Sequence, residues 1–139
     1  MRVKASVRNR PLSHEAVVST NDAVKSLPIP PKDSGCGSSV NGGELLLLAL
    51  ATCYCNDVYR EAARRGIAID SIEVTAEADF PAEGRPAENI RYHARVASRA
   101  SEREIRELLR HADEVAEIQR TIRAGVPIEL ESVAIEASE

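Results

Sequence analysis

Three cysteines are the residues of this chain with the widest range of chemistry. Cys53 and Cys55 fall within an apolar stretch, and Cys36 stands between two glycines. A thiolate is a nucleophile and a redox centre, whereas a buried thiol packs as a small apolar group. An odd number of cysteines does not favour a disulfide framework of the secreted type. The residues alone therefore leave two interpretations of Cys53, a reactive thiol and a core residue.

The spacing of Cys53, Cys55 and Asp57 determines what chemistry they could share on a helix. Cys55 would lie about 200° around the helix axis from Cys53, so the two thiols could not form a disulfide without unwinding. Asp57 comes four residues after Cys53 and is expected on the same face, one turn away. A carboxylate there raises the pKa of the thiol unless a guanidinium lies between them. We therefore expect a partnership of an arginine with Asp57 or Cys53, and Arg10 is the nominee.

A helix over residues 43–65 is predicted to position these side chains. Asn41 followed three residues later by Glu44 resembles a capping box, which marks the start of a helix. Cys53 would lie mid-helix, where the dipole of its own helix contributes little to thiol acidity. Residues 45–55 are apolar on nearly all sides, which predicts burial in the centre of the molecule or in a dimer interface. The more polar residues 56–65 are expected to reach solvent.

The other elements follow from alternation and capping signals. Short alternating stretches before residue 28 predict a small antiparallel meander, and a loop rich in Pro, Gly and Ser follows over residues 28–43. After the helix the pattern predicts two strands, a helix opened by a second capping box, a further turn and a last strand, over residues 67–79, 89–98, 101–116, 118–124 and 128–135. The expected fold class is α+β, in a single domain over residues 1–139.

Composition and charge exclude several classes of function. The 139 residues include 18 basic and 22 acidic side chains, a net charge of −4, which gives no electrostatic footprint for nucleic acid or an anionic membrane. The longest apolar run, residues 45–51, is far short of the ~20 residues that span a bilayer. With no signal-peptide pattern in the first residues, we expect a cytoplasmic protein. Cysteines and histidines lack the spacing of a zinc site, and no phosphate loop or dinucleotide fingerprint is present, so no metal and no cofactor are expected.

The helix sequence from Ser39 to Cys53, SVNGGELLLLALATC, resembles the central-helix signature of the OsmC/Ohr superfamily of osmotically inducible and organic hydroperoxide resistance proteins. The resemblance extends through Asp57-Val58, Arg65-Gly66-Ile67 and the following strand to the second helix and the closing segment near residue 126. It also covers the hairpin around residues 14–18, and thus essentially the whole chain.

The resemblance implies an OsmC-like fold with N-terminal antiparallel hairpins, a long buried central helix and a second half of strands and helix, assembled as an intertwined homodimer. It further implies thiol peroxidase chemistry, in which Cys53 is oxidised by an organic or hydrogen peroxide to a sulfenic acid. In that family an arginine of the N-terminal hairpin holds the thiolate, and Arg10 or Arg8 occupies the corresponding region.

Three positions depart from the family pattern. Ala116 stands where the family places its resolving cysteine, so the usual intramolecular disulfide cannot form. Gly43 stands where related members place a catalytic glutamate, and the adjacent Glu44 is rotated by about 100° on a helix. The dipeptide before the helix is Asn41-Gly42 in place of a residue followed by proline. An external thiol reductant is therefore expected, with Cys36 as an alternative resolving thiol and Cys55 as an alternative peroxidatic residue.

Two functions of different classes follow. The first is a thiol-dependent redox protein that reduces organic hydroperoxides through Cys53 in an oxidative stress response. The alternative is a non-catalytic module that holds a lipid-like or other hydrophobic small molecule in a pocket at the dimer interface. The scarcity of aromatic residues, three Tyr, one Phe and no Trp, favours an aliphatic peroxide or lipid as the ligand.

Overall fold

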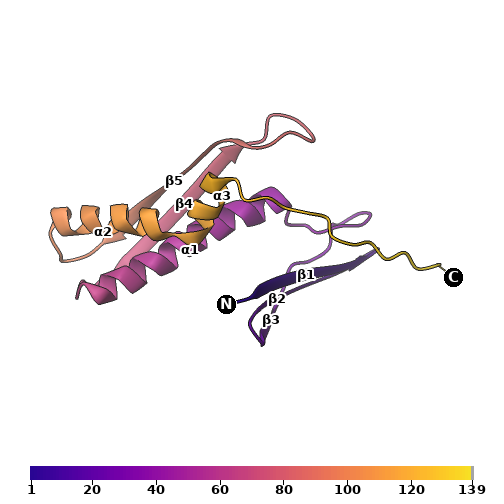
Figure 1. The fold of residues 1–139 in the computed structure, drawn as a ribbon, viewed down its shortest axis with the longest axis horizontal. Helices are drawn as coiled ribbons and strands as arrows, with labels where there is room; N and C mark the ends of the chain where they lie inside the picture. Colours follow the sequence, from indigo (N-terminus) through magenta and orange to yellow (C-terminus); the bar gives the residue numbers. More distant parts are fainter. Residues whose placement is uncertain (139) are drawn as a thin grey trace. The chain divides into compact units, whose positions relative to one another are not determined.

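The computed structural model describes residues 1–138 and divides into two compact units, Met1–Leu48 and the residues from Ala49 onward. The elements follow in the order β1, β2, β3, α1, β4, β5, α2, α3 (Figure 1). This is the mixed α+β class with two antiparallel sheets that the sequence predicts. The expectation of a single domain over residues 1–139 stays a prediction.

The first unit is the predicted antiparallel meander. Strands β1 (Val3–Arg10), β2 (Ser13–Thr20) and β3 (Ala23–Leu27) form a sheet in that order. Leu12 and Asn21, in the two tight turns, both have a positive φ, 63° and 52°. Strands β1 and β2 are longer than the alternation alone predicted, because their pairing continues to Arg10 and Ser13 beside the turn, whereas β3 has the predicted bounds. The loop that follows carries Cys36 and is closed by an isolated bridge between Pro31 and Ser38.

Helix α1 spans Gly42–Arg64 and begins at the predicted capping box. The backbone N–H of Glu44 donates to Asn41 Oδ1 at 2.8 Å, and that of Asn41 donates to Glu44 Oε1 at 3.0 Å. Gly66, with φ +68°, follows the helix in the left-handed conformation that ends many helices. Both boundaries of the predicted helix are therefore confirmed to within a residue.

The second unit packs the α1 residues from 49 onward against a hairpin and two further helices. The hairpin consists of β4 (Ser71–Asp79) and β5 (Glu88–Ala97), and the helices are α2 (Glu102–Val115) and α3 (Glu117–Ala124). Ser101 and Glu104 form the predicted capping box of α2. The core joins α1 to α2 and is flanked by alternate residues of the hairpin; its buried members are Tyr54, Val58, Ala62, Leu108 and Ala112.

Burial along α1 corrects one prediction. The part expected to reach solvent contains Asp57, Val58, Glu61 and Ala62, all at most 6% exposed, because α2 and the hairpin cover this face. Three leucines of the first turns are exposed in the single chain, Leu45, Leu46 and Leu48, the last by 60%. Their predicted burial at a dimer interface stays a prediction.

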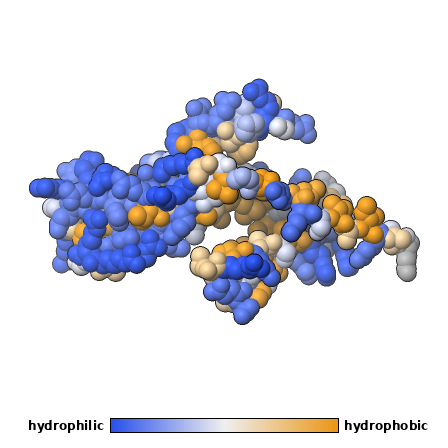
Figure 2. Space-filling view, in the orientation of Figure 1, coloured by the Kyte–Doolittle hydropathy of each residue, from blue (hydrophilic) through white to orange (hydrophobic). Residues whose placement is uncertain are grey.

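Two elements near the C-terminus also differ from the prediction. Residues 118–124, expected as a further turn, belong to the eight-residue helix α3, which ends at Gly125 with φ +61°. Residues 128–135, expected as a strand, have no strand partner and expose their apolar side chains, Ile128 by 97% and Ile135 by 92%. A strand needs a neighbouring edge, and alternation alone does not supply one. Figure 2 shows hydrophobic residues along this last segment and mostly hydrophilic ones over α2.

Candidate functional site

The half-buried thiol of Cys53 lies between helix α1, which carries it, and the first residue of α3. Its Sγ is 3.9 Å from Asp57 Oδ2, one turn along α1, and 3.9 Å from Glu117 Oε2. The predicted placement of Asp57 on the same helix face is therefore confirmed. Glu117 comes from 64 residues further along the chain.

The surroundings of Cys53 oppose ionisation of its thiol. Burial raises the pKa of Cys53 above its ordinary value, and the negative charges of Asp57 and Glu117 raise it further. The backbone of Ile118 and of Glu117 lowers the pKa of Cys53, but by less than burial and the two charges raise it. The thiol is thus held in its protonated form to a higher pH than a free cysteine.

Both residues belong to the first turn of α3. The dipole of the helix that carries Cys53 is expected to contribute little at a mid-helix position. The first turn of a different helix, α3, lies beside the sulfur, with Glu117 Oε2 3.9 Å from Sγ, and a helix N-terminus favours negative charge. Nothing in the local sequence around Cys53 indicates this contact.

Asp57 has a guanidinium partner from its own helix. Arg60 Nη1 lies 3.0 Å from Asp57 Oδ1, and Nη2 of the same arginine lies 3.6 Å from Glu61 Oε1. Burial raises the pKa of Asp57 and the charge of Arg60 lowers it, with a net upward direction. An Arg-Asp partnership was expected with Arg10 as nominee, and the structure supplies Arg60, at i+3 on α1.

Four of the remaining candidate residues belong to the first unit, and Cys55 belongs to the second. Arg8 and Arg10 lie on β1 and Cys36 lies in the loop after β3, all within the first unit, and their role at Cys53 stays a prediction. Glu44 is occupied by the capping box of α1. Cys55 is a partly buried free thiol, on the other side of α1 from Cys53.

Glu117 is the site residue that the sequence analysis missed. It follows Ala116, the position at which the family resemblance expects a resolving cysteine, and Ala116 is completely buried where α2 ends and α3 begins. The signal that could have found it was this adjacency, since a residue next to a predicted resolving thiol must lie near Cys53. In this chain the neighbour contributes a carboxylate.

The cluster also brings metal-ligating atoms together. One ligand atom from each of Cys53, Asp57 and Glu117 lies within 4.8 Å of the others. The expectation of no metal was drawn from the spacing of cysteines and histidines, which gives no information about carboxylates from other elements.

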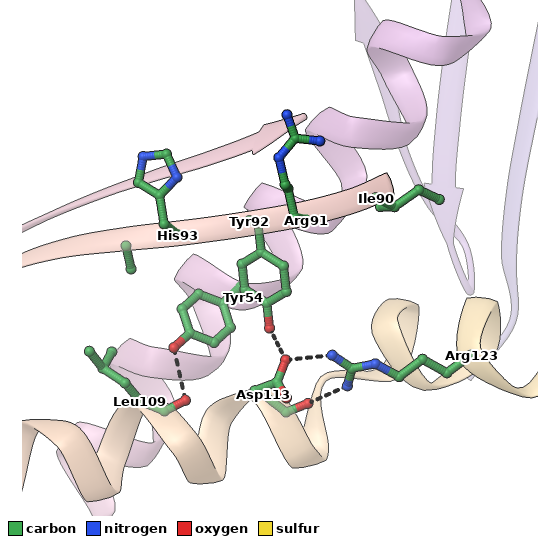
Figure 3. A pocket seen from close by; sticks show the side chains of 9 residues that line it. Tyr54, Ile90, Arg91, Tyr92, His93, Leu109, Asp113 and Arg123 are labelled. Carbon is green, nitrogen blue, oxygen red and sulfur yellow. Dashed lines mark hydrogen bonds and ion pairs between the residues drawn. The ribbon is translucent and has the colours of Figure 1, made fainter. Parts of the chain in front are cut away.

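A cavity of about 400 Å³ lies on another side of α1, next to Tyr54. Figure 3 shows Tyr54 and Tyr92 beside it, with Tyr92 Oη donating to Asp113 and Tyr54 Oη donating to the Leu109 carbonyl at 2.8 Å. Arg123 Nη2 completes the group, 2.9 Å from Asp113 Oδ1. The ion pair and the tyrosine thus join β5, α2 and α3 at the edge of the cavity.

Within the described residues 1–138, no helix combines the length and apolar composition needed to cross a membrane. The expectations of no nucleic acid and a cytoplasmic location stay predictions.

Comparison with known proteins identifies the family to which the chain belongs. The model of the OsmC-like protein family matches residues 35–131, and the chain belongs to this family. No curated protein matches the sequence. The family match contains α1 with Cys53 and continues through α3.

Solved structures show the same fold at low sequence identity. An OsmC-like protein from Mycoplasma pneumoniae is 18% identical with a TM-score of 0.61, covering 86% of this chain and 87% of its own. The organic hydroperoxide resistance protein OsmC from Legionella pneumophila is 20% identical with a TM-score of 0.60, over 88% and 90%. An OsmC-like hydroperoxide resistance protein from Jannaschia sp. CCS1 is 11% identical with a TM-score of 0.55, over 98% and 92%.

Proposed function

We propose that this chain is a thiol-dependent reductase of organic hydroperoxides with Cys53 as its peroxidatic residue. Support comes from its membership of the OsmC-like family, from neighbours of the same fold that are hydroperoxide resistance proteins, and from the position of Cys53. The observation that carries the proposal is a half-buried thiol with two carboxylate oxygens, Asp57 Oδ2 and Glu117 Oε2, each 3.9 Å from its sulfur.

The reaction follows from thiol chemistry. The Cys53 sulfur attacks the distal oxygen of ROOH, the O–O bond breaks, and the products are a sulfenic acid, Cys53–SOH, and the alcohol ROH. The proton on the thiol is transferred to the departing alkoxide, and Asp57 and Glu117 are the two carboxylates within reach of that proton.

A second thiol must then reduce the sulfenic acid. Cys55 lies on the other side of α1, and Ala116 carries no thiol, so we propose an external thiol as the reductant. One R′SH condenses with Cys53–SOH to a mixed disulfide and water, and a second R′SH releases Cys53–SH and R′SSR′. Cys36, in the first unit, is the alternative resolving thiol.

A homodimer is part of the same proposal. A three-stranded sheet needs one face covered to be stable, and Val3 and Val7 of β1 are 63% and 69% exposed in the single chain. Leu48 of α1 and the apolar residues after position 127 are exposed as well. A second copy that covers these residues would also bring an N-terminal arginine, Arg10 or Arg8, to each Cys53. Sedimentation analysis tests the dimer directly.

The peroxidase proposal is tested by following cumene hydroperoxide consumption with dithiothreitol as reductant. We expect Cys53→Ser to abolish turnover and Cys55→Ser, the same change on the same helix, to retain it. A sulfenic acid trap should label Cys53 after one equivalent of peroxide. A Cys53 thiol that stays reduced under equimolar peroxide contradicts the proposal.

A second candidate function is binding of a hydrophobic small molecule without turnover. The cavity of about 400 Å³ beside Tyr54 favours it, since Ile90, Ala94 and Leu109 line it together with the two tyrosines. This cavity is not the interface pocket lined by the Leu-rich start of the helix that the sequence suggested. Leu109→Trp, which fills the cavity, is expected to abolish binding of an aliphatic probe such as decanol while leaving peroxide turnover unchanged.

A further inference from the structure

The loop that carries Cys36 is joined to the N-terminal sheet by one side chain. Hydrogen bonds within the loop close it on itself, such as the bond from the Lys32 N–H to the Gly37 carbonyl at 3.0 Å. The backbone N–H of Gly37, next to Cys36, donates instead to Asn9 Oδ1 of β1 at 3.0 Å. Among the described residues 1–138, this is the hydrogen bond that connects residues 30–40 to the sheet.

The Gly37 contact determines the orientation of the Asn9 amide and the proton state of His14. A backbone N–H can only donate, so the Asn9 atom that faces it must be the oxygen. The other atom of the amide, Asn9 Nδ2, lies 2.9 Å from His14 Nδ1, and an amide nitrogen can only donate. His14 Nδ1 must therefore accept, which requires a neutral imidazole with its proton on Nε2.

A protonated His14 cannot make this contact. Both ring nitrogens of an imidazolium are donors, so rotation of the ring does not restore an acceptor. Asn9 can accept from the charged ring only if its amide turns over, which places Nδ2 against the Gly37 N–H. The two donors then compete for Oδ1, and a hydrogen bond from a charged donor is roughly twice as strong as one from a neutral amide. The charged ring therefore binds the oxygen, and Gly37 loses its acceptor.

The strands and the loop start present one charged group beside His14. The partly buried ring lies on the wall of a cavity of about 680 Å³ in the first unit. Glu15 is the charged residue that shares this wall, and the other lining residues, 16–17 and 26–30, are uncharged.

The charged groups near the rest of the contact are cations. The Lys32 side chain packs against Gly37, where a Cβ would lie 3.4 Å from Lys32 Cε. Arg8 and Arg10 flank Asn9 in β1, and the alternation of a strand directs their side chains to the opposite face of the sheet. The group in the contact that gains or loses a proton near neutral pH is thus the imidazole itself.

We propose that Asn9 is a proton-controlled tether for the loop that carries Cys36. It binds the Gly37 amide while His14 is neutral and releases that amide when His14 gains a proton. Histidine is the side chain that ordinarily changes charge between about pH 5 and 8, so mild acid frees the loop from the sheet. Cys36, the alternative resolving thiol, moves with the loop. The tether does not depend on the proposed function, since it involves no reaction of Cys53.

The experiment follows the Gly37 amide and the His14 ring by NMR in the full-length chain over the same pH range. Loss of the hydrogen bond should move the Gly37 amide proton toward its random-coil position and steepen its temperature coefficient. We expect both changes to share their midpoint with the titration of the His14 Cε1 proton. A Gly37 temperature coefficient that stays constant while His14 titrates overturns the proposal.

Two substitutions should change this response in different ways. His14→Gln keeps an acceptor for the Asn9 amide and gains no proton in this range, so the Gly37 signal should stay at its neutral position. Asn9→Asp supplies two acceptor oxygens, one for Gly37 and one for the charged ring. Its hydrogen bond to Gly37 should therefore persist in acid, and the midpoint of the His14 titration should rise. A Gly37 transition that is unchanged in either variant contradicts the proposal.

His93→Gln is the matched control. His93 lies on β5 in the second unit, whereas Asn9 and Gly37 belong to the first. The Gly37 transition and its midpoint should match those of the parent. Loss of the transition in this variant as well would mean a general response of the chain to acid and would overturn the assignment to His14.

Discussion

The two ends of α3 make contrasting polar clusters. At its C-terminal end, Arg123 and Tyr92 both donate to Asp113, so one carboxylate is matched by a cation and a hydroxyl. At its N-terminal end, two carboxylates face a thiol, and the Arg60 guanidinium pairs with Oδ1 of Asp57, while Oδ2 of the same carboxylate faces the thiol. Burial opposes the charge of Asp113, but its partners outweigh burial and lower its pKa, whereas the pKa values of Cys53 and Asp57 are raised.

The contrast separates a cluster that stabilises the fold from one that the fold must hold in place. A matched cluster contributes to stability when its charged form is present. A cluster of like charges costs stability and persists because surrounding packing fixes it, which is typical of functional sites. Substitutions at each end of α3 test whether the two clusters behave in these opposite ways.

The largest expected effect on stability is at the matched end. Asp113→Ala leaves the Tyr92 hydroxyl and the Arg123 guanidinium without their acceptor. We expect a loss of about 1–2 kcal/mol in the free energy of unfolding, reduced from the value of a fully buried pair because Arg123 is half exposed. Urea denaturation measures it. A loss below about 0.5 kcal/mol would remove the contrast between the two ends.

The corresponding change at the thiol end is Asp57→Asn. Removing the charge while keeping the shape should leave the free energy of unfolding within about 0.5 kcal/mol or raise it, because the carboxylate is buried beside a like charge. The rate of Cys53 alkylation at neutral pH should increase. A stability loss comparable with that of Asp113→Ala would show that the ion pair with Arg60 fully compensates the burial of Asp57 and its repulsion by like charges.

Glu117→Gln should give a smaller effect on reactivity. Its carboxylate is solvent-exposed, so its influence on the thiol is screened, and we expect the Cys53 alkylation rate to rise roughly two- to fivefold. Raising the salt concentration should narrow the difference between variant and parent. An equal rate in both proteins at low salt would exclude a Coulombic role for Glu117.

The two ends should also respond to opposite limits of pH. Because the pKa of Asp113 is lowered in the folded protein, its carboxylate stabilises the fold at pH values above the pKa of the unfolded state. This stabilisation is lost as the pH falls through the pKa of the folded state. Because the pKa of Cys53 is raised above the ordinary value of 9.0, its protonated thiol stabilises the fold fully below pH 9.0. This stabilisation is lost as the pH rises through the pKa of the folded state. Thermal midpoints across pH should therefore lose their acid slope in Asp113→Asn and part of their alkaline slope in Cys53→Ser.

The smallest effect is expected on the exposed face of α2. Arg106 pairs with Glu102 at 2.8 Å, but both side chains are more than three-quarters exposed. Arg106→Gln should change the free energy of unfolding by about 0.5 kcal/mol or less. A larger loss would mean that this face is covered in the assembled protein.

The sequence predicted the elements whose signals are local. Asn41 with Glu44 and Ser101 with Glu104 marked both long helices, and alternation marked the strands, because capping and pleating involve near neighbours. Asp57 was placed correctly for the same reason. Glu117 and Gln119 were missed because they meet α1 across more than 60 residues, and no local pattern encodes that contact.

Tyr54, between Cys53 and Cys55, has an optical consequence. Its ring meets that of Tyr92 edge to face with centroids 4.8 Å apart, and burial, with the charge of Asp113, raises its pKa to about 12. With no tryptophan in the chain, tyrosine emission is not masked by energy transfer to an indole. Tyrosine emission therefore reports on the packing of the second unit's core, where Tyr54 of α1 meets Tyr92 of β5, without any added dye.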